Sequence, residues 1–195
     1  MILLEVHDGL LAEPLRILPV GNDQGWRVLT PCEVDPPENP AFGDLAAICP
    51  LLREAADHEG GIHFEVFNAL MLEIFKRAPS GQPLKSMFNA KQLHYVGEIN
   101  VHHLKGQSKP ATVYQFEKER TRVRVLWLYG EKRMTLILTH MFIKPGGKKS
   151  TTPPVQVDRA GTIYNSYVSA VERGVARLIH QQGGRDGFER LGRCA

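Results

Sequence analysis

Two apolar segments separated by a short turn constrain the fold of this chain more than any other feature. Residues 122–129 begin with alternating basic and apolar side chains, and residues 134–143 are almost continuously apolar. The turn between them contains Gly130, Glu131 and Lys132. A period of two is typical of a strand with one buried face, and a short turn joins antiparallel neighbours. We therefore predict an antiparallel hairpin at the centre of a sheet, with a further strand at 113–116.

Three segments with helical periodicity surround the predicted strands. Helices are expected at 44–58, where Asp44 is a suitable N-cap and Pro50 can kink the helix, at 62–78 and at 155–180. The middle segment is the most regular, because its apolar side chains recur every three or four residues, at Phe64, Phe67, Leu70, Met71, Ile74 and Phe75. We therefore expect an α/β (α+β) fold, in which helices flank a twisted antiparallel sheet of three or four strands.

The first 43 residues differ from the rest in their pattern. Short apolar runs at 2–6, 15–20 and 26–29, with a turn at 21–25, indicate a small antiparallel unit. Residues 31–43 contain four prolines, which is typical of a linker or a rigid surface loop. We predict a β-rich extension and linker at 1–43, a main domain at 44–182 and a flexible tail at 183–195.

The sequence lacks the signatures of several function classes. No apolar run approaches the roughly 18 residues that a membrane span needs, and the start of the chain does not resemble a secretory signal. Cys32, Cys49 and Cys194 are far apart, which argues against a disulfide framework and suits a reducing compartment. There is no Walker loop, no Rossmann glycine fingerprint and no H-E-x-x-H motif. We expect a cytoplasmic protein that uses no membrane, metal or cofactor.

Charge is distributed unevenly along the chain. The net formal charge is only +3, but residues 100–160 contain 12 Lys and Arg against 4 Asp and Glu. Residues 1–99 have the opposite balance, with 7 Lys and Arg against 14 Asp and Glu. A strongly basic block is what a polyanion such as RNA would contact, although a solvated basic face without a partner has the same composition.

Five short segments follow one another in order between His102 and Asn165. They read H-H-L-K-G, then V-Y-Q-F, then R-V-R-V-L-W, then L-I-L-T-H-M-F-I-K with a Lys-rich loop ending in Thr-Pro-Pro, and finally V-Q-V-D-R-A. This series resembles the phage-derived branch of the RelE/HigB toxin superfamily, whose strands and loops carry similar segments in the same order. The resemblance covers the C-terminal half of the chain.

The resemblance implies the toxin of a toxin-antitoxin system. Such a protein is a compact RelE-like domain that cleaves mRNA without a metal, generally at the ribosome, and thereby arrests translation and growth. Its partners would be mRNA, the ribosome and a cognate antitoxin. Metal-independent cleavage needs a base for the ribose 2′-OH, cations for the charged phosphorane and an acid for the leaving oxygen.

Matching positions supply the predicted site residues. Arg124 matches the Arg of the family's Arg-Val-Leu-Tyr strand and would clamp a phosphate. His140 and Lys144 match the family's strand-end His and the first Lys after it, and complete the predicted catalytic set. A hydrogen-bonded structural His is an equally good interpretation of His140. Tyr114 matches a family Tyr that is also consistent with a structural role. The predicted RNA-binding residues are Lys105, Arg122, Lys148 and Lys149.

Two departures from the family pattern leave an alternative open. Glu117 stands where the family has an Arg, so an anion replaces a cation, and Arg120 or Arg122 could compensate for it. Pro145 stands where a second Lys is expected. The alternative is a catalytically silent RNA-binding or protein-interaction module on the same fold, with the acidic N-terminal half masking the basic site.

Overall fold

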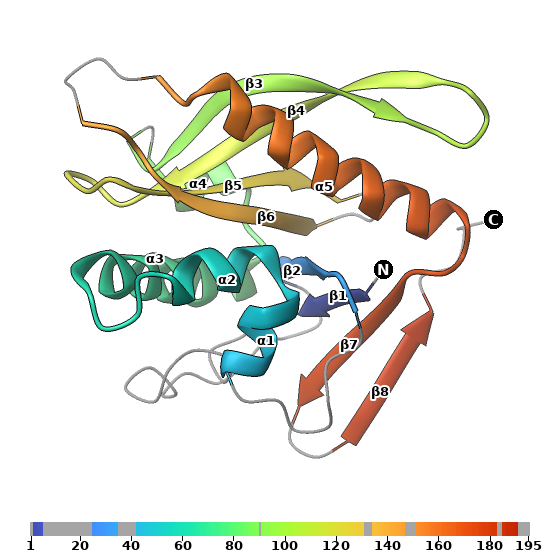
Figure 1. Ribbon diagram of the computed structural model, residues 1–195, viewed down its shortest axis with the longest axis horizontal. Coiled ribbons are helices and arrows are strands. Elements are labelled where there is room, and N and C mark those ends of the chain that lie inside the picture. The colour runs from blue at the N-terminus through green and yellow to red at the C-terminus, as the bar shows by residue number, and fades with distance from the viewer. Residues whose placement is uncertain are drawn as a thin grey trace.

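Helices lie against both faces of a central sheet in this protein (Figure 1). The computed structural model describes residues 2–5, 25–34, 42–89, 91–130, 134–146, 151–182 and 185–190. These residues form a mixed α+β architecture, which confirms the predicted fold class.

The sheet contains more strands than the sequence pattern predicted. Among the described residues, eight strands follow the order β3-β4-β5-β6-β2-β1-β7-β8. The predicted central hairpin is formed by β5 and β6, which pair antiparallel with Val123 opposite Ile143 and Tyr129 opposite Leu136. Two neighbouring pairs, β2–β6 and β1–β7, are parallel. The bounds are β1 Ile2–Glu5, β2 Arg27–Cys32, β3 Leu93–His102, β4 Ser108–Glu117, β5 Val123–Tyr129, β6 Thr135–Ile143, β7 Arg177–Gln182 and β8 Arg185–Arg190.

The helices differ from the predicted ones at their ends. The expected helix at 44–58 is divided into α1 (Phe42–Ile48) and α2 (Pro50–Ala56), because Cys49 is extended before Pro50 at the start of α2. The helix α3 (Ile62–Arg77) matches its prediction closely. The short elements η3 (Ala78–Ser80) and α4 (Leu84–Met87) follow it. The helix α5 (Pro154–Glu172) is shorter than the predicted 155–180, because Gly174 takes a φ of 67° and the chain then turns into β7.

Two apolar clusters hold the layers together. One lies between the sheet and helices α1 to α4 and includes Phe67, Phe116 and Trp127, each with no exposed surface. The other lies between the sheet and α5 and includes Leu126 and Tyr164. The helix α5 approaches β3 closely, and a Cβ atom at Gly161 would lie 3.0 Å from the Ile99 side chain. The sheet therefore has two differently covered faces, which we call the α3 face and the α5 face.

The terminal strands belong to the same sheet as the middle of the chain. The strand β2 pairs with β6 between Arg27–Thr135 and Leu29–Ile137, so the boundary predicted at residue 43 does not separate two sheets. Residues 185–190 of the predicted flexible tail form β8 and pair with β7. The strands β1 and β2 of the N-terminal segment therefore belong to the same sheet as β5 and β6.

Candidate functional site

Polar side chains collect on the α5 face, where β4 and β5 meet the start of α5. Side chains alternate along β4, so Gln115 and Glu117 lie on the α5 face while Phe116 packs on the α3 face. Glu117 and Arg124 are direct partners in the β4–β5 register. The sequence thus places a carboxylate opposite the guanidinium that was predicted to clamp phosphate.

Arg124 is enclosed by the protein rather than presented to solvent. Its residue is 5% exposed, and its Nε lies 2.8 Å from Glu117 Oε2, although the N–H is not aligned for a hydrogen bond. Its NH1 group donates to the backbone oxygens of Thr121 and Val123, each at 2.9 Å. Burial lowers the pKa of Arg124 and the charge of Glu117 raises it. The guanidinium charge is therefore already compensated inside the protein.

Glu117 is held in place by other polar groups. Gln115 Nε2 donates to Glu117 Oε2 at 2.9 Å, and Thr152 Oγ1 donates to Gln115 Oε1 at 2.7 Å. His94 Nε2 lies 3.5 Å from Glu117 Oε1. Because Pro153 alone separates Thr152 from α5, these contacts connect the carboxylate to the start of that helix.

His140 lies on the same face but has no exposed surface. His140 is the register partner of Leu126, which packs on the α5 face, and the imidazole Nε2 is 2.9 Å from Gln156 Oε1 of α5. Burial lowers the pKa of His140 to about 4, against a smaller upward effect of the Gln156 hydrogen bond. The ring is therefore neutral at neutral pH and donates to Gln156, as the structural interpretation of this residue expects.

Exposed and partly exposed cations surround the same end of the sheet. The β4–β5 turn carries Lys118, Arg120 and Arg122, and Arg122 is joined to Lys144 after β6. Arg122 Nε donates to the Lys144 carbonyl at 2.7 Å, and the Lys144 backbone N–H donates to the Arg122 carbonyl at 2.8 Å. We call Lys118, Arg120, Arg122 and Lys144 the basic end. Its one acidic neighbour in the turn, Glu119, is paired with Lys91 at 3.2 Å.

The remaining predicted site residues do not join this group. Lys105 is exposed in the β3–β4 turn, at the opposite end of β4 from Glu117, and the 10 residues of β4 span about 30 Å. Tyr114 stacks on Trp127 with ring centroids 4.8 Å apart on the α3 face, which is a structural position. Lys148 and Lys149 lie outside the described residues.

The N-terminal half packs against the basic block through the β3–β4 and β2–β6 pairings, and its acidic side chains bear on whether it masks the basic end. Glu54 of α2 pairs with Arg159 of α5 at 2.6 Å. None of the described acids among residues 1–99 forms an ion pair with a cation of the basic end. The described acids of residues 1–99 therefore do not neutralise the cations of the basic end.

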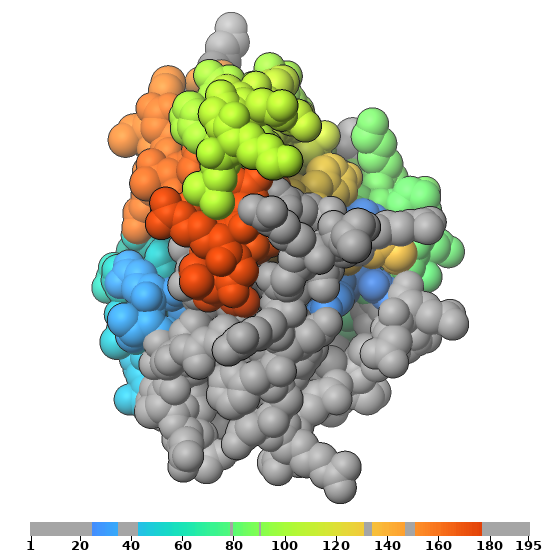
Figure 2. Space-filling view, turned by 90° about the vertical axis from the view of Figure 1, so that its right-hand side faces the viewer, coloured from blue at the N-terminus to red at the C-terminus, as the bar shows by residue number. Residues whose placement is uncertain are grey.

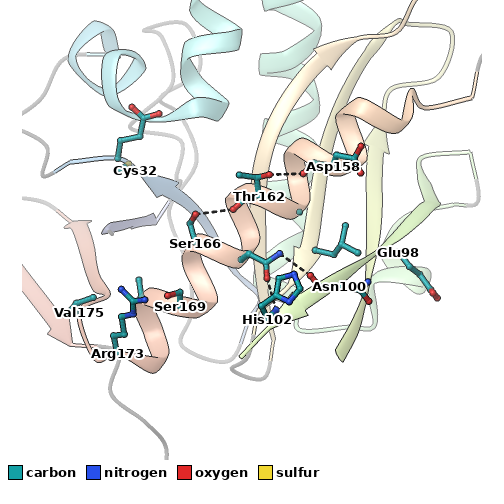
Figure 3. Close-up of a pocket in the computed structure, with 15 residues that line it drawn as sticks. Cys32, Glu98, Asn100, His102, Asp158, Thr162, Ser166, Ser169, Arg173 and Val175 are labelled. Carbon is teal, nitrogen blue, oxygen red and sulfur yellow. Dashed lines mark hydrogen bonds between the residues drawn. The ribbon is translucent and has the colours of Figure 1, made fainter. Parts of the chain in front are cut away.

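A polar groove of about 980 Å³ runs between α5 and the edge strand β3 (Figure 3). Asn165 of α5 joins the two elements, because its Nδ2 donates to the Asn100 carbonyl at 3.0 Å and its Oδ1 accepts from the His102 N–H at 2.8 Å. The turn between β3 and β4 meets the end of α5 (Figure 2), and there Glu172 Oε1 lies 2.7 Å from His103 Nδ1. Sequence reasoning missed this groove, although small polar residues recur at helical spacing along α5 at Thr162, Asn165, Ser166 and Ser169.

Comparisons with known proteins assign neither a family nor a function to this chain. The sequence matches no family model, and neither a curated protein nor a solved structure matches the chain. Within the described ranges, no cluster of three or more His, Cys, Asp and Glu could hold a metal ion. No helix in those ranges combines the length and apolar character that crossing a membrane requires. The RelE-like resemblance stays a prediction.

Proposed function

We propose that this chain is an RNA-binding protein of the RelE-like kind that does not cleave RNA in the conformation described. The observation that carries this proposal is the buried contact between Arg124 and Glu117, with 2.8 Å between Nε and Oε2. A phosphate clamp must offer its guanidinium to the ligand. The guanidinium of Arg124 is instead compensated by a carboxylate and by two backbone oxygens.

His140 supports the same interpretation. A general acid or base must reach the proton it transfers and must titrate near the working pH. The His140 ring has no exposed surface and a pKa of about 4, so it is neutral and enclosed at pH 7. Neither of these two predicted catalytic side chains is positioned for chemistry on a bound RNA.

The basic end supports RNA binding. Lys118, Arg120, Arg122 and Lys144 project from a turn and a strand end that hydrogen bonds hold together. Such cations displace condensed counterions from RNA, and binding through them weakens steeply as salt rises. As part of this proposal, the protein acts in the cytoplasm on mRNA, in association with the ribosome, and is countered by a cognate antitoxin.

The endoribonuclease toxin is the second candidate. One observation favours it: Arg122, Arg124, His140 and Lys144 all belong to β5, β6 or the residues that flank them, so the predicted residues converge on one hairpin end. This function requires the Glu117–Arg124 contact to open when RNA binds. Under it, Glu117→Gln would release Arg124 and increase RNA cleavage.

Fluorescence anisotropy with a labelled single-stranded RNA tests the proposed binding. We expect Arg122→Ala and Lys144→Ala each to weaken binding and to reduce the slope of log K against log salt by about 1. Lys105→Ala, a matched removal of one exposed cation about 30 Å away, should change neither. The proposed site would be contradicted if all three variants lost RNA affinity equally, or if the unaltered protein showed no salt-dependent RNA binding.

A further inference from the structure

Two cysteines distant in sequence come together beneath β2. Cys32 ends β2, and Cys49 lies between α1 and α2. Thr30 and Cys32 are two residues apart on a strand, so their side chains point to the same face, which is the face that α1 and α2 cover. Both cysteines are buried, with 1% and 0% of their surfaces exposed, and they are not joined in a disulfide.

Contacts on both sides bring the two thiols toward each other. The Glu33 backbone N–H donates to the Ile48 carbonyl at 2.8 Å, which sets the neighbouring residues Cys32 and Cys49 side by side. Thr30 Oγ1 lies 3.4 Å from Cys49 Sγ, so the sulfur of Cys49 sits over the β2 face that also carries the Cys32 side chain. The ion pair of Glu33 with Arg53, at 2.9 Å, joins the same segments a second time.

The surroundings of Cys49 favour its thiolate form. Burial alone raises the pKa of the Cys49 thiol. Hydrogen bonds from Cys32, from Thr30 and from the backbone N–H groups of Leu52 and Leu51 outweigh burial, and the resulting pKa lies below the usual value. The thiolate is the form that attacks an oxidant.

Of the two cysteines, Cys32 borders the groove described above, and 1% of its surface is exposed. Cys32 and Glu33 are among the residues that line the groove, and Figure 3 shows Cys32 at the side away from Asn100 and His102. We propose that Cys32 and Cys49 are a redox-active pair that hydrogen peroxide converts into an intramolecular disulfide. The pair is independent of the proposed RNA-binding function.

The reaction balances with peroxide as the two-electron oxidant. The Cys49 thiolate attacks one peroxide oxygen, the O–O bond breaks, and the hydroxide that leaves takes up a proton to become water. The Cys32 sulfur then attacks the sulfenic acid at Cys49, an S–S bond forms, and a second water leaves with the hydroxyl and the thiol proton. The disulfide links the end of β2 covalently to the junction of α1 and α2, and dithiothreitol reduces it back to two thiols.

Mass spectrometry of the full-length protein tests this pair directly. Arg27 and Arg53 are the nearest trypsin sites on either side, so both cysteines fall in one tryptic peptide and Cys194 falls in another. After peroxide treatment, denaturation and alkylation, we expect this peptide to be unalkylated and lighter by two hydrogens. We also expect the midpoint of thermal unfolding to rise by about 5 °C or more, and dithiothreitol to reverse both changes.

Single variants provide the controls. Cys32→Ser and Cys49→Ser should each lose the stabilisation by peroxide, whereas Cys194→Ser should retain it. The measurement on the unaltered protein stands alone if a variant fails to fold. Full alkylation of both cysteines after peroxide, oxidation to sulfinic acid without a bridge, or pairing of either cysteine with Cys194 would each overturn the proposal.

Discussion

The two faces of the sheet bury different kinds of side chain. On the α3 face, Phe116 and Trp127 stack with ring centroids 5.0 Å apart inside a large cluster of apolar side chains. On the α5 face, the neighbouring strand positions carry Glu117 and Arg124, together with His140. The α3 face therefore depends on filled volume, whereas the end of the α5 face depends on particular polar partners. Adjacent residues of β4 belong to opposite faces, so single substitutions there can test the α3 face and the α5 face separately.

Phe116→Ala should have the largest effect on stability. Phe116 has no exposed surface and contacts both Trp127 and Phe88 through its ring. Its truncation leaves a cavity, and we expect the free energy of unfolding to fall by about 4 kcal/mol, measured by chemical denaturation. RNA binding per folded molecule should stay unchanged, because the residue faces away from the basic end. A loss of binding in the folded variant would show that the two faces are not independent.

Glu117→Ala should lower the free energy of unfolding by about 3 kcal/mol, because it leaves the buried guanidinium of Arg124 without its counter-charge. The double variant Glu117→Leu/Arg124→Met removes both charges and should recover most of the stability that Glu117→Ala loses. Denaturation of the two variants measures the coupling between the side chains. A cost below about 1 kcal/mol for Glu117→Ala would mean that the ion pair does not stabilise this face.

His140 should make the α5 face sensitive to acid. In the unfolded chain the ring takes up a proton near its ordinary pKa of about 6.5, whereas in the folded protein burial holds the pKa at about 4. Below pH 6.5 the unfolded state therefore binds more protons, and this group's contribution to the free energy of unfolding falls by about 3 kcal/mol as the pH drops toward 4. Comparing denaturation curves between pH 7 and 4 for the unaltered protein and for His140→Gln isolates the effect. Identical pH dependence in both would contradict it.

Arg122→Ala should have the smallest effect on stability, within about 0.5 kcal/mol, because the side chain is exposed. Its effect should appear in RNA affinity instead. Thermal unfolding and anisotropy on the same preparation separate the two quantities. A variant that loses stability and binding in parallel would make Arg122 a structural residue.

The sequence predicted local features of the fold well. The hairpin β5–β6 follows from alternation and from the turn at Gly130, and α3 follows from a regular apolar stripe. Pro50 was the only sequence signal for the break between α1 and α2, and a proline is equally consistent with the start of a helix and with a kink in one. The parallel pairing of β2 with β6 was not predictable, because it joins strands more than a hundred residues apart and has no turn to indicate it.

The sequence named several residues that lie near one another in the structure, but it did not predict their surroundings. Arg124, His140, Arg122 and Lys144 do lie at one hairpin end, whereas Lys105 lies at the far end of β4. The sequence contained a signal for the neutralised Arg124: only a short turn separates β4 from β5, so Glu117 could have been placed opposite it. The pKa of His140 depends on burial by α5, which strand alternation alone does not reveal.

The most direct test of the central claim measures RNA binding and RNA cleavage by the same protein. We would induce the full-length chain in bacteria beside Arg124→Ala and Lys144→Ala, map the 5′ ends of cellular mRNA, and measure anisotropy with labelled RNA on the purified proteins. We predict salt-dependent binding that Lys144→Ala weakens, with no new 5′ ends in any strain. New 5′ ends and growth arrest that appear with the unaltered chain and disappear with Arg124→Ala would contradict it and establish the nuclease.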